Sequence, residues 1–250
     1  MILKITIISL LLVNIKAAPI KKILILTPMA SEFAAFNKNQ NHKITKIEGT
    51  NSFAFKIKNK NIIVSTIGIG AVNAATLSTL LIKKINPDLI IVSGVAGGLQ
   101  KHIKIGDVVV ATKVFSVNFG KYTKFGPTFE TGAPTNPIKN IEQPLIYKTK
   151  IDLIKKNIKF KNTYIGPIAT TQNWPNNQNI VNLLHNNNIF AIAMEDAAVA
   201  QVCWMFNKPI IVIRGISDNQ FLNIEYNQEN VKVAAKAAKD VTIKLIELLE

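Results

Sequence analysis

The sequence predicts an α/β fold: a single domain of three layers, α/β/α, whose middle layer is a mixed, largely parallel sheet. Short apolar runs alternate with stretches of helical periodicity along the chain, a pattern typical of strands buried between helices. Neither a repeat nor a linker divides the 250 residues. A hydrophobic fraction of 48% is enough for a sizeable core and excludes a disordered chain.

The first half of the chain shows the alternation clearly. Lys22 to Thr27 reads as a buried strand because its apolar residues are continuous, and Pro28 ends it. The elements expected next are a helix from Ala30 to Phe36, strands from Ser52 to Ile57 and from Ile62 to Ile67, and an amphipathic helix from Ala71 to Ile85.

A second group of elements surrounds a glycine-rich segment. Leu89 to Ser93 is expected as a strand that enters a turn at Gly94 to Gly98, and Gly106 to Ala111 as the next strand. Between Ser116 and Lys148 no periodicity is visible, which favours a functional or interfacial segment.

The second half returns to alternation and closes on a long helix. The elements expected are a helix from Leu145 to Asn157, a strand from Thr163 to Thr170, a helix over 180–188, a strand edge from Ala191 to Met194, a helix from Glu195 to Phe206, a strand from Pro209 to Ile213 and a helix from Val231 to Leu249.

The N-terminus has the pattern of a signal peptide. A lysine precedes the apolar stretch Ile5 to Val13, and small residues follow at Ala17 and Ala18. That stretch is too short to span a membrane, so we expect no transmembrane anchor. Residues 1–17 are therefore a predicted leader, and 18–250 the folded domain. Export to the periplasm or the medium is the expectation. The alternative is a cytoplasmic protein in which residues 1–17 form an extra strand or reflect a mis-assigned start.

Charge alone suggests a polyanion partner. The formal net charge is +15, yet the basic residues are lysines spread along the chain, with Arg214 as the single arginine. No nucleic-acid recognition motif accompanies them, so we expect no nucleic-acid partner. Weak polyanion binding at a cell surface stays open as an alternative function. Cys203, the one cysteine, and three histidines without ligand spacing favour neither a metal nor any other cofactor.

Unusual residues gather where the predicted strands end. In an open α/β sheet, ligands bind beyond the carboxyl ends of the strands. Four such segments stand out: Met29 to Glu32, Gly94 to Gly98, Met194-Glu195, and Arg214 to Asp218. Each acid has a plain structural reading, as a solvated charge, a helix-dipole partner or a helix cap. Together, in a chain with only 15 acids, they predict one site.

The same segments resemble a known family. Met29-Ala-Ser-Glu32, Gly68-Ile-Gly70, Ser93-Gly-Val-Ala-Gly-Gly98, Gly106-Asp-Val-Val109, Ala193-Met-Glu195 and Val212-Ile-Arg-Gly-Ile-Ser-Asp218 look like the nucleoside phosphorylase family, and most like its 5′-methylthioadenosine/S-adenosylhomocysteine nucleosidases. The resemblance extends from about Lys22 to Leu249.

The resemblance implies hydrolysis of the N-glycosidic bond of a purine nucleoside. It assigns Asp218 as the general acid at purine N7 and Glu32 as the group that activates water, a division of labour like that of inverting glycosidases. An acid that donates near neutral pH needs a raised pKa. The remaining implied contacts are Glu195 with the ribose hydroxyls, Met194 with the sugar, Trp174 with the purine face, Gly97 through its backbone, Arg214 near the ribose, and Met29 at the pocket.

Several residues bear on the choice between water and phosphate. A phosphorylase gathers arginines and hydroxyls around its anion, whereas this chain has one arginine and has Val95 where the family often has serine. We therefore favour water, with a phosphorylase as the alternative. Arg214 also fits a structural ion pair.

Two parts of the pocket are left open. Pro175 falls where the family reads adenine through a backbone N–H that proline lacks; the side chains of Gln172, Asn173 or Asn219 are candidates to replace it. The 5′ wall is open among Phe221, Ile224 and Tyr226. The family often completes that wall from a neighbouring subunit, which implies a homodimer and an interfacial role for residues 116–137.

Overall fold

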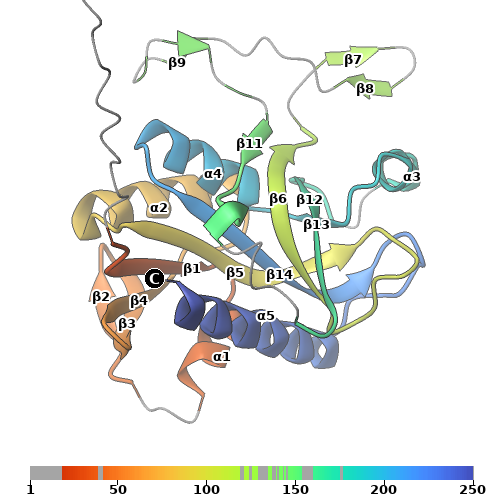
Figure 1. Cartoon of the computed structure of the whole chain (residues 1–250). Coiled ribbons are helices and arrows are strands. Elements are labelled where there is room, and N and C mark those ends of the chain that lie inside the picture. The colour runs from red at the N-terminus through yellow and green to blue at the C-terminus, as the bar shows by residue number, and fades with distance from the viewer. Residues whose placement is uncertain are drawn as a thin grey trace, which may run out of the picture.

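A mixed sheet of ten strands organises the molecule, with helices on both of its faces (Figure 1). The computed structural model describes residues 19–38, 42–118, 121–123, 126–128, 135–136, 139, 141–142, 144, 146–153, 160–174 and 177–249. The predicted leader and Pro175 lie outside these ranges. Within them, no helix combines the length and the apolar character that crossing a membrane requires.

The strands of this sheet are β1 (Lys22–Thr27), β2 (Thr45–Ile47), β3 (Thr50–Ile57), β4 (Lys60–Thr66), β5 (Leu89–Gly98), β6 (Val108–Ser116), β11 (Ile146–Lys148), β12 (Thr163–Thr170), β13 (Ala191–Ala193) and β14 (Ile210–Asn219). The helices are α1 (Ala30–Asn37), α2 (Ala71–Ile85), the short 3₁₀ helix η1 (Ile151–Leu153), α3 (Gln178–Asn186), α4 (Asp196–Met205) and α5 (Gln228–Leu248). Two small ladders pair β7 (Lys121–Thr123) with β8 (Gly126–Thr128), and β9 (Thr135–Asn136) with β10 (Ile141–Glu142).

Part of the sheet closes on itself. The parallel set β4–β1–β5–β14 forms its centre, and β6–β12–β13 is a second parallel set. The two sets meet through antiparallel pairing of β13 with β5 and of β14 with β6, so the strands β5, β14, β6, β12 and β13 form a closed circuit. The closure explains why β5 and β14 are buried along their whole length.

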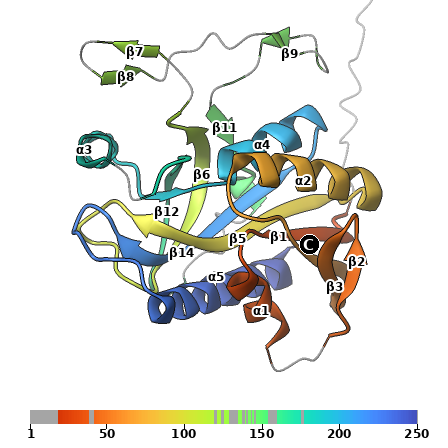
Figure 2. The same ribbon diagram turned by 180° about the vertical axis from the view of Figure 1, so that it is seen from behind.

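Two apolar cores flank the sheet. One, on the side of α2 and α4, contains Leu24, Leu81 and Val199; the other, on the side of α1 and α5, contains Ile23, Phe33 and Leu245. The two helix pairs lie on opposite faces in both views (Figures 1 and 2). This arrangement confirms the predicted three-layer α/β/α class.

The predicted turn at Gly94 to Gly98 is wrong, because β5 continues through all five residues. Its glycines are needed for space and not for a turn: Gly94, Gly97 and Gly98 all lack a positive φ. A Cβ added at Gly94 would lie 2.4 Å from Glu32 Oε1 and 2.6 Å from Arg214 Nη1. The predicted strand end before Arg214 is wrong for a related reason, since β14 pairs with this extension of β5 as far as Asn219.

The predicted helix from Leu145 to Asn157 is also wrong in the part that the structure describes. Residues 146–148 form β11, in which Tyr147 pairs with Val114 of β6, and η1 follows. The apolar residues of this segment therefore pack against a sheet edge that the local sequence does not reveal. The segment 116–148, expected to be irregular, contains four further short strands, β7 to β10.

The ends of several elements differ from prediction; α3, for example, spans Gln178–Asn186 and not 180–188, and β6 continues to Ser116 and not only to Ala111. Helix α5 begins at Gln228 and not at Val231, because the side chain of Asn227 accepts a hydrogen bond from the N–H of Asn230 and caps the helix. Glu195 is the residue before α4 and not its first turn.

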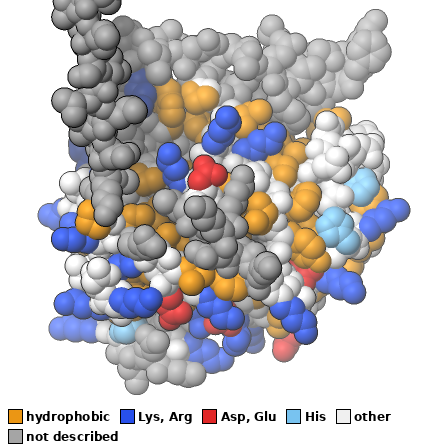
Figure 3. Space-filling model, viewed as in Figure 1, with side chains coloured by type: hydrophobic (Ala, Val, Ile, Leu, Met, Phe, Trp, Pro, Cys, Tyr) orange, Lys and Arg blue, Asp and Glu red, His pale blue; other side chains and the backbone are white. Residues whose placement is uncertain are grey.

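The lysines are distributed over the surface. On the face seen in Figure 3, blue side chains occur in several separate places around apolar and neutral ones. Among the described residues on this face, the basic side chains do not form one continuous patch.

Candidate active site

A cavity of about 210 Å³ lies at the carboxyl ends of the central parallel strands. The connection after β1, the end of β5, the residues before α4 and the end of β14 all reach it, as the sequence predicts for strand-end segments. Its lining consists of Pro28, Met29, Glu32, Ile69, Val95, Ala96, Trp174, Ile192, Ala193, Met194, Glu195, Arg214, Ser217 and Tyr226.

Glu32 is buried at one side of this cavity, with 2% of its surface exposed. It occupies the third position of α1, and its Oε2 accepts a hydrogen bond of 2.6 Å from the N–H of Met29. Its Oε1 accepts one of 2.7 Å from the N–H of Val95. Burial raises the pKa of the Glu32 carboxyl from 4.5 to about 7, although Arg214 and both N–H groups lower it. The carboxyl is therefore fixed in position and ready to exchange a proton near neutrality.

Glu195 approaches from the start of α4. Its Oε1 accepts a 3.0 Å hydrogen bond from the N–H of Gly70, and its Oε2 a 2.9 Å bond from Arg214 Nη2. Gly70 precedes α2 with φ +88°, a conformation that favours glycine. Burial raises the pKa of Glu195, and Arg214 and Gly70 oppose the rise.

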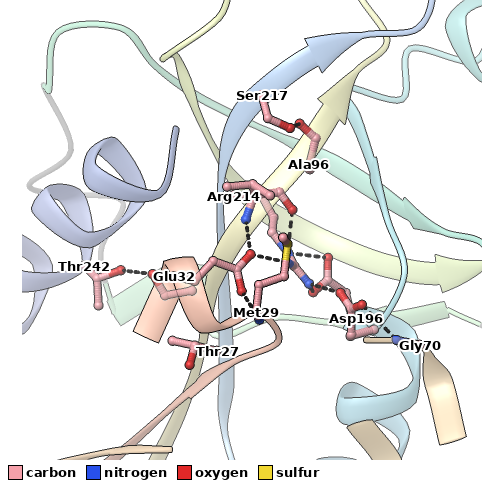
Figure 4. A network of polar contacts seen from close by, with 12 residues as sticks. Thr27, Met29, Glu32, Gly70, Ala96, Asp196, Arg214, Ser217 and Thr242 are labelled. Atoms are coloured by element: carbon pink, nitrogen blue, oxygen red, sulfur yellow. Dashed lines mark hydrogen bonds and ion pairs between the residues drawn. The ribbon is translucent and has the colours of Figure 1, made fainter. Parts of the chain in front are cut away.

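Arg214 is almost fully buried on β14 and connects these carboxylates (Figure 4). Its Nε donates to both oxygens of Asp196, at 3.0 and 3.1 Å, and its Nη2 donates to Asp196 Oδ1 at 2.5 Å. Its Nη1 donates to the carbonyl oxygen of Val95 at 3.1 Å and lies 3.9 Å from Glu32 Oε1. Burial lowers the pKa of Arg214, but Asp196 and Glu195 raise it by more, so the guanidinium stays charged. Arg214 therefore forms the structural ion pair that the sequence leaves open for it, and it also lines the cavity.

Asp218 lies at a β-bulge near the end of β14. The register with β5 shifts between Ile216 and Asp218, so Ser217 is an extra residue there. Ser217 consequently lines the cavity, and its Oγ donates to Asp218 Oδ1 at 2.8 Å. Burial raises the pKa of Asp218 from 3.8 to about 6, against the hydrogen bonds from Ser217 and Gln220. The raised pKa is the property that a proton donor needs.

Gly97 leaves room for two side chains at once. A Cβ at this position would lie 2.7 Å from Trp174 Cη2 and 2.9 Å from Asp218 Oδ2. The indole edge of Trp174 therefore lies beside the Asp218 carboxyl, at the rim of the cavity, with 36% of Trp174 exposed.

Comparison with known proteins assigns the chain to a family. A sequence model of the phosphorylase superfamily matches residues 22–247. The chain belongs to the phosphorylase superfamily.

Three relatives show which members of the superfamily this chain is similar to. The 5′-methylthioadenosine/S-adenosylhomocysteine nucleosidase of Exiguobacterium sp. is 31% identical over 79% of this chain and 85% of its own. That of Haemophilus ducreyi is 29% identical over 90% of this chain and 97% of its own. The solved nucleosidase from S. pneumoniae, with the transition-state inhibitor MT-ImmA, superimposes with a TM-score of 0.76 at 26% identity, over 92% of this chain and 100% of its own.

Most residues that the superfamily resemblance singles out come together in the structure. Met29, Glu32, Trp174, Met194, Glu195 and Arg214 line the cavity. Gly97 and Asp218 are not part of the lining, but Gly97 lies against Trp174 and Asp218 is hydrogen-bonded to Ser217. Pro175, the expected departure from the superfamily pattern, lies outside the described residues.

The residues proposed for the 5′ wall and for the base contact differ in whether they reach the cavity. Tyr226 lines the cavity, whereas the Phe221 ring stacks on His185 with centroids 3.6 Å apart. Asn219 is unsuited to reading the base, because its amide donates to the carbonyl oxygens of Gln100 and Ile103 and shapes the turn after β14.

Sequence reasoning missed three contributors to the site. Asp196 is not among the residues that the sequence singles out, yet it is the main partner of Arg214. Ser217 and the N–H of Gly70 were not assigned contacts. Two adjacent acids at a predicted helix start are a local signal for Asp196. A bulge, and a hydrogen bond between the residues that precede α2 and α4, leave no local signal. Among the described residues, no cluster of three or more His, Cys, Asp or Glu side chains has a geometry that would hold a metal ion.

Proposed function

We propose that this protein hydrolyses the N-glycosidic bond of a purine nucleoside of the methylthioadenosine or S-adenosylhomocysteine type. The main observation is one apolar cavity lined by Glu32, whose pKa is about 7, by the fixed cation Arg214 and by Ser217, which donates a hydrogen bond to the buried Asp218, whose pKa is about 6. The nucleosidases named above support the substrate class.

Asp218 acts as the acid in this scheme. A purine leaves poorly as an anion, so protonation at N7 is needed as the bond from C1′ to N9 breaks. The electron pair of that bond goes to the purine, which departs neutral. The raised pKa keeps a proton available on Asp218, and the hydroxyl of Ser217 holds the carboxyl at 2.8 Å.

Glu32 acts on the water. Its two backbone hydrogen bonds fix the carboxylate, which takes a proton from the water as the water oxygen bonds to C1′. The positive charge that develops on the ribose ring is stabilised by the neighbouring carboxylates. The products are the free base and a 5-substituted ribose, and both carboxyls return to their starting states by proton exchange with solvent.

Glu195 holds the sugar hydroxyls. Each of its oxygens already accepts one hydrogen bond, from Gly70 or from Arg214, and each keeps a lone pair for a ribose hydroxyl. Met194 and Trp174 supply apolar contact to the sugar and the base.

The lining favours water over phosphate as the acceptor. Among the described residues that line the cavity, Arg214 is the one cation. Its hydrogen bonds go to Asp196, Glu195 and Val95, so little of its donor capacity is left for a phosphate ion. A dianion would also approach two carboxylates, which repel it.

Base release decides between these reactions. Purified protein is incubated with methylthioadenosine, adenosine and inosine, each with and without phosphate, and the free base is quantified. Release independent of phosphate is expected, and Glu32→Gln and Asp218→Asn are expected to lose activity by at least about 100-fold. Asp107→Asn, at a buried aspartate that binds the N–H of Lys104 outside the cavity, is the matched control. Release that strictly requires phosphate would establish a phosphorylase instead.

We also propose a homodimer. Ile69, at the cavity, is 51% exposed, and Val72 on the adjoining turn of α2 is 79% exposed, so apolar surface borders the site. A second copy would cover this surface. Light scattering coupled to size-exclusion chromatography should give twice the chain mass, and a monomer at micromolar concentration would contradict the proposal.

Export remains our proposal for localisation. It is supported by the leader pattern of residues 1–17 in the sequence. Expression of the full chain in a Gram-negative host, followed by N-terminal sequencing of the periplasmic fraction, should give a chain that starts at Ala18 or Pro19. An intact Met1 in the cytoplasm would contradict it.

A further inference from the structure

Asp196 does not cap helix α4, although its position at the start of that helix suggests this role. An acid in the first turn usually caps the helix or faces its dipole. Here the N–H of Ala197 is bound instead by the hydroxyl of Thr170, at 3.0 Å, and the residue before the helix provides no side-chain cap. The Asp196 side chain is completely buried and both of its oxygens contact Arg214.

The contacts of Arg214 account for four of its five N–H groups. A guanidinium has one N–H on Nε and two each on Nη1 and Nη2. The Nε–H is shared between the oxygens of Asp196, and the Nη2 hydrogens go to Asp196 and Glu195. One Nη1 hydrogen goes to the carbonyl oxygen of Val95. A single Nη1–H is left.

That last N–H is on the nitrogen that faces Glu32. The distance from Nη1 to Glu32 Oε1 is 3.9 Å, too long for a direct hydrogen bond and suited to a shared water molecule. The two-point contact with Asp196 fixes the plane of the guanidinium and so determines where Nη1 points. Figure 4 shows the guanidinium lying between the Glu32 and Asp196 carboxylates.

We propose that Asp196 is a positioning residue for the hydrolysis: it orients Arg214 so that the free Nη1–H and the Glu32 carboxylate hold the attacking water between them. This inference rests on the proposed function. It predicts an effect on the chemical step more than on substrate binding, because Glu195, the proposed ribose contact, keeps its bond from Gly70 when Asp196 is changed.

Steady-state kinetics of Asp196→Asn, Arg214→Lys and the double variant test the inference. Asp196→Asn keeps the shape but weakens the two-point contact, and a misplaced water costs on the order of 10- to 100-fold in kcat. KM should change by less than about threefold. Because Asp196 acts through Arg214, adding Asp196→Asn to Arg214→Lys should lower kcat little further.

Two control variants distinguish a positioning role of Asp196 from a purely structural one. Asp107→Asn removes a carboxylate that is buried about as deeply as Asp196 but lies outside the cavity, and it should leave kcat within about twofold of wild type. If Asp196→Asn does not fold, as judged by thermal melting, Asp196→Glu keeps the charge while moving the carboxylate by one methylene group, and the same loss of kcat is expected.

The outcomes distinguish this inference from the function on which it rests. Active wild-type protein together with wild-type kcat in Asp196→Asn or Asp196→Glu overturns the role of Asp196 alone. Multiplicative losses in the double variant overturn it too, since they would show that Asp196 acts independently of Arg214. A wild-type protein that releases no base overturns the proposed function first, and this role with it.

Discussion

Replacing Glu32 by glutamine should change how the stability of the protein depends on pH. The carboxyl has a pKa of about 7 in the folded chain and 4.5 as its ordinary value, so the folded state binds its proton more tightly than the unfolded state. The stability that this group contributes is therefore complete below pH 4.5 and is lost as the pH rises through 7. By proton linkage, this one group lowers the free energy of unfolding of the wild-type protein by about 2.5 kcal/mol between pH 5 and pH 8.

The variant Glu32→Gln has no such group to titrate. Its amide opposes one of the two backbone N–H donors with a donor of its own, which destabilises the fold by about 1–3 kcal/mol at every pH. That constant penalty cancels when the difference between wild type and variant at pH 5 is subtracted from the difference at pH 8.

Urea denaturation at the two pH values, followed by circular dichroism, measures the effect. The free energy of unfolding of the variant, relative to that of the wild type, should rise by about 2.5 kcal/mol from pH 5 to pH 8. Glu247→Gln, at an exposed position near the end of α5, is the control and should show no comparable gain. A wild-type-to-variant difference that is the same at both pH values would refute the reasoning that burial raises the pKa of Glu32.

Three further predictions follow from the same geometry. The profile of kcat/KM against pH should be bell-shaped with a maximum near about pH 6.5, since Glu32 must lose its proton and Asp218 keep its own; a profile without a descending alkaline limb would contradict the role of Asp218. Gly97→Ala should lower kcat/KM by at least about tenfold, because its Cβ would displace Trp174 or Asp218; unchanged kinetics would show that both side chains move freely. Gly215→Ala should destabilise the fold by about 3 kcal/mol in urea denaturation, because its Cβ would lie 2.0 Å from the carbonyl oxygen of Ala234 in α5; a loss below about 1 kcal/mol would mean that the helix shifts at little cost.

The glycines of β5 show where sequence reasoning about the fold reaches its limit. Continuous apolar runs predict β1 with its observed bounds, and periodicity does the same for α2. A run such as Gly94 to Gly98 favours a turn on local grounds. Its extended conformation is set by partners far away in sequence: β14 pairs alongside it, and Arg214 and Glu32 take up the space that a Cβ at Gly94 would fill.

The sequence by itself determined the layered fold and brought Glu32, Glu195, Arg214 and Asp218 forward as one site, because strand-end positions converge in a parallel sheet and acids are scarce in this chain. Only the tertiary structure decided how these groups are tuned. The pKa values of Glu32 and Asp218 depend on burial, and the Arg214 guanidinium is held by Asp196 at the start of α4, 18 residues earlier in the chain. Desolvation and the orientation of a hydrogen-bonded fork are properties of packed surroundings, which no local pattern of residues contains.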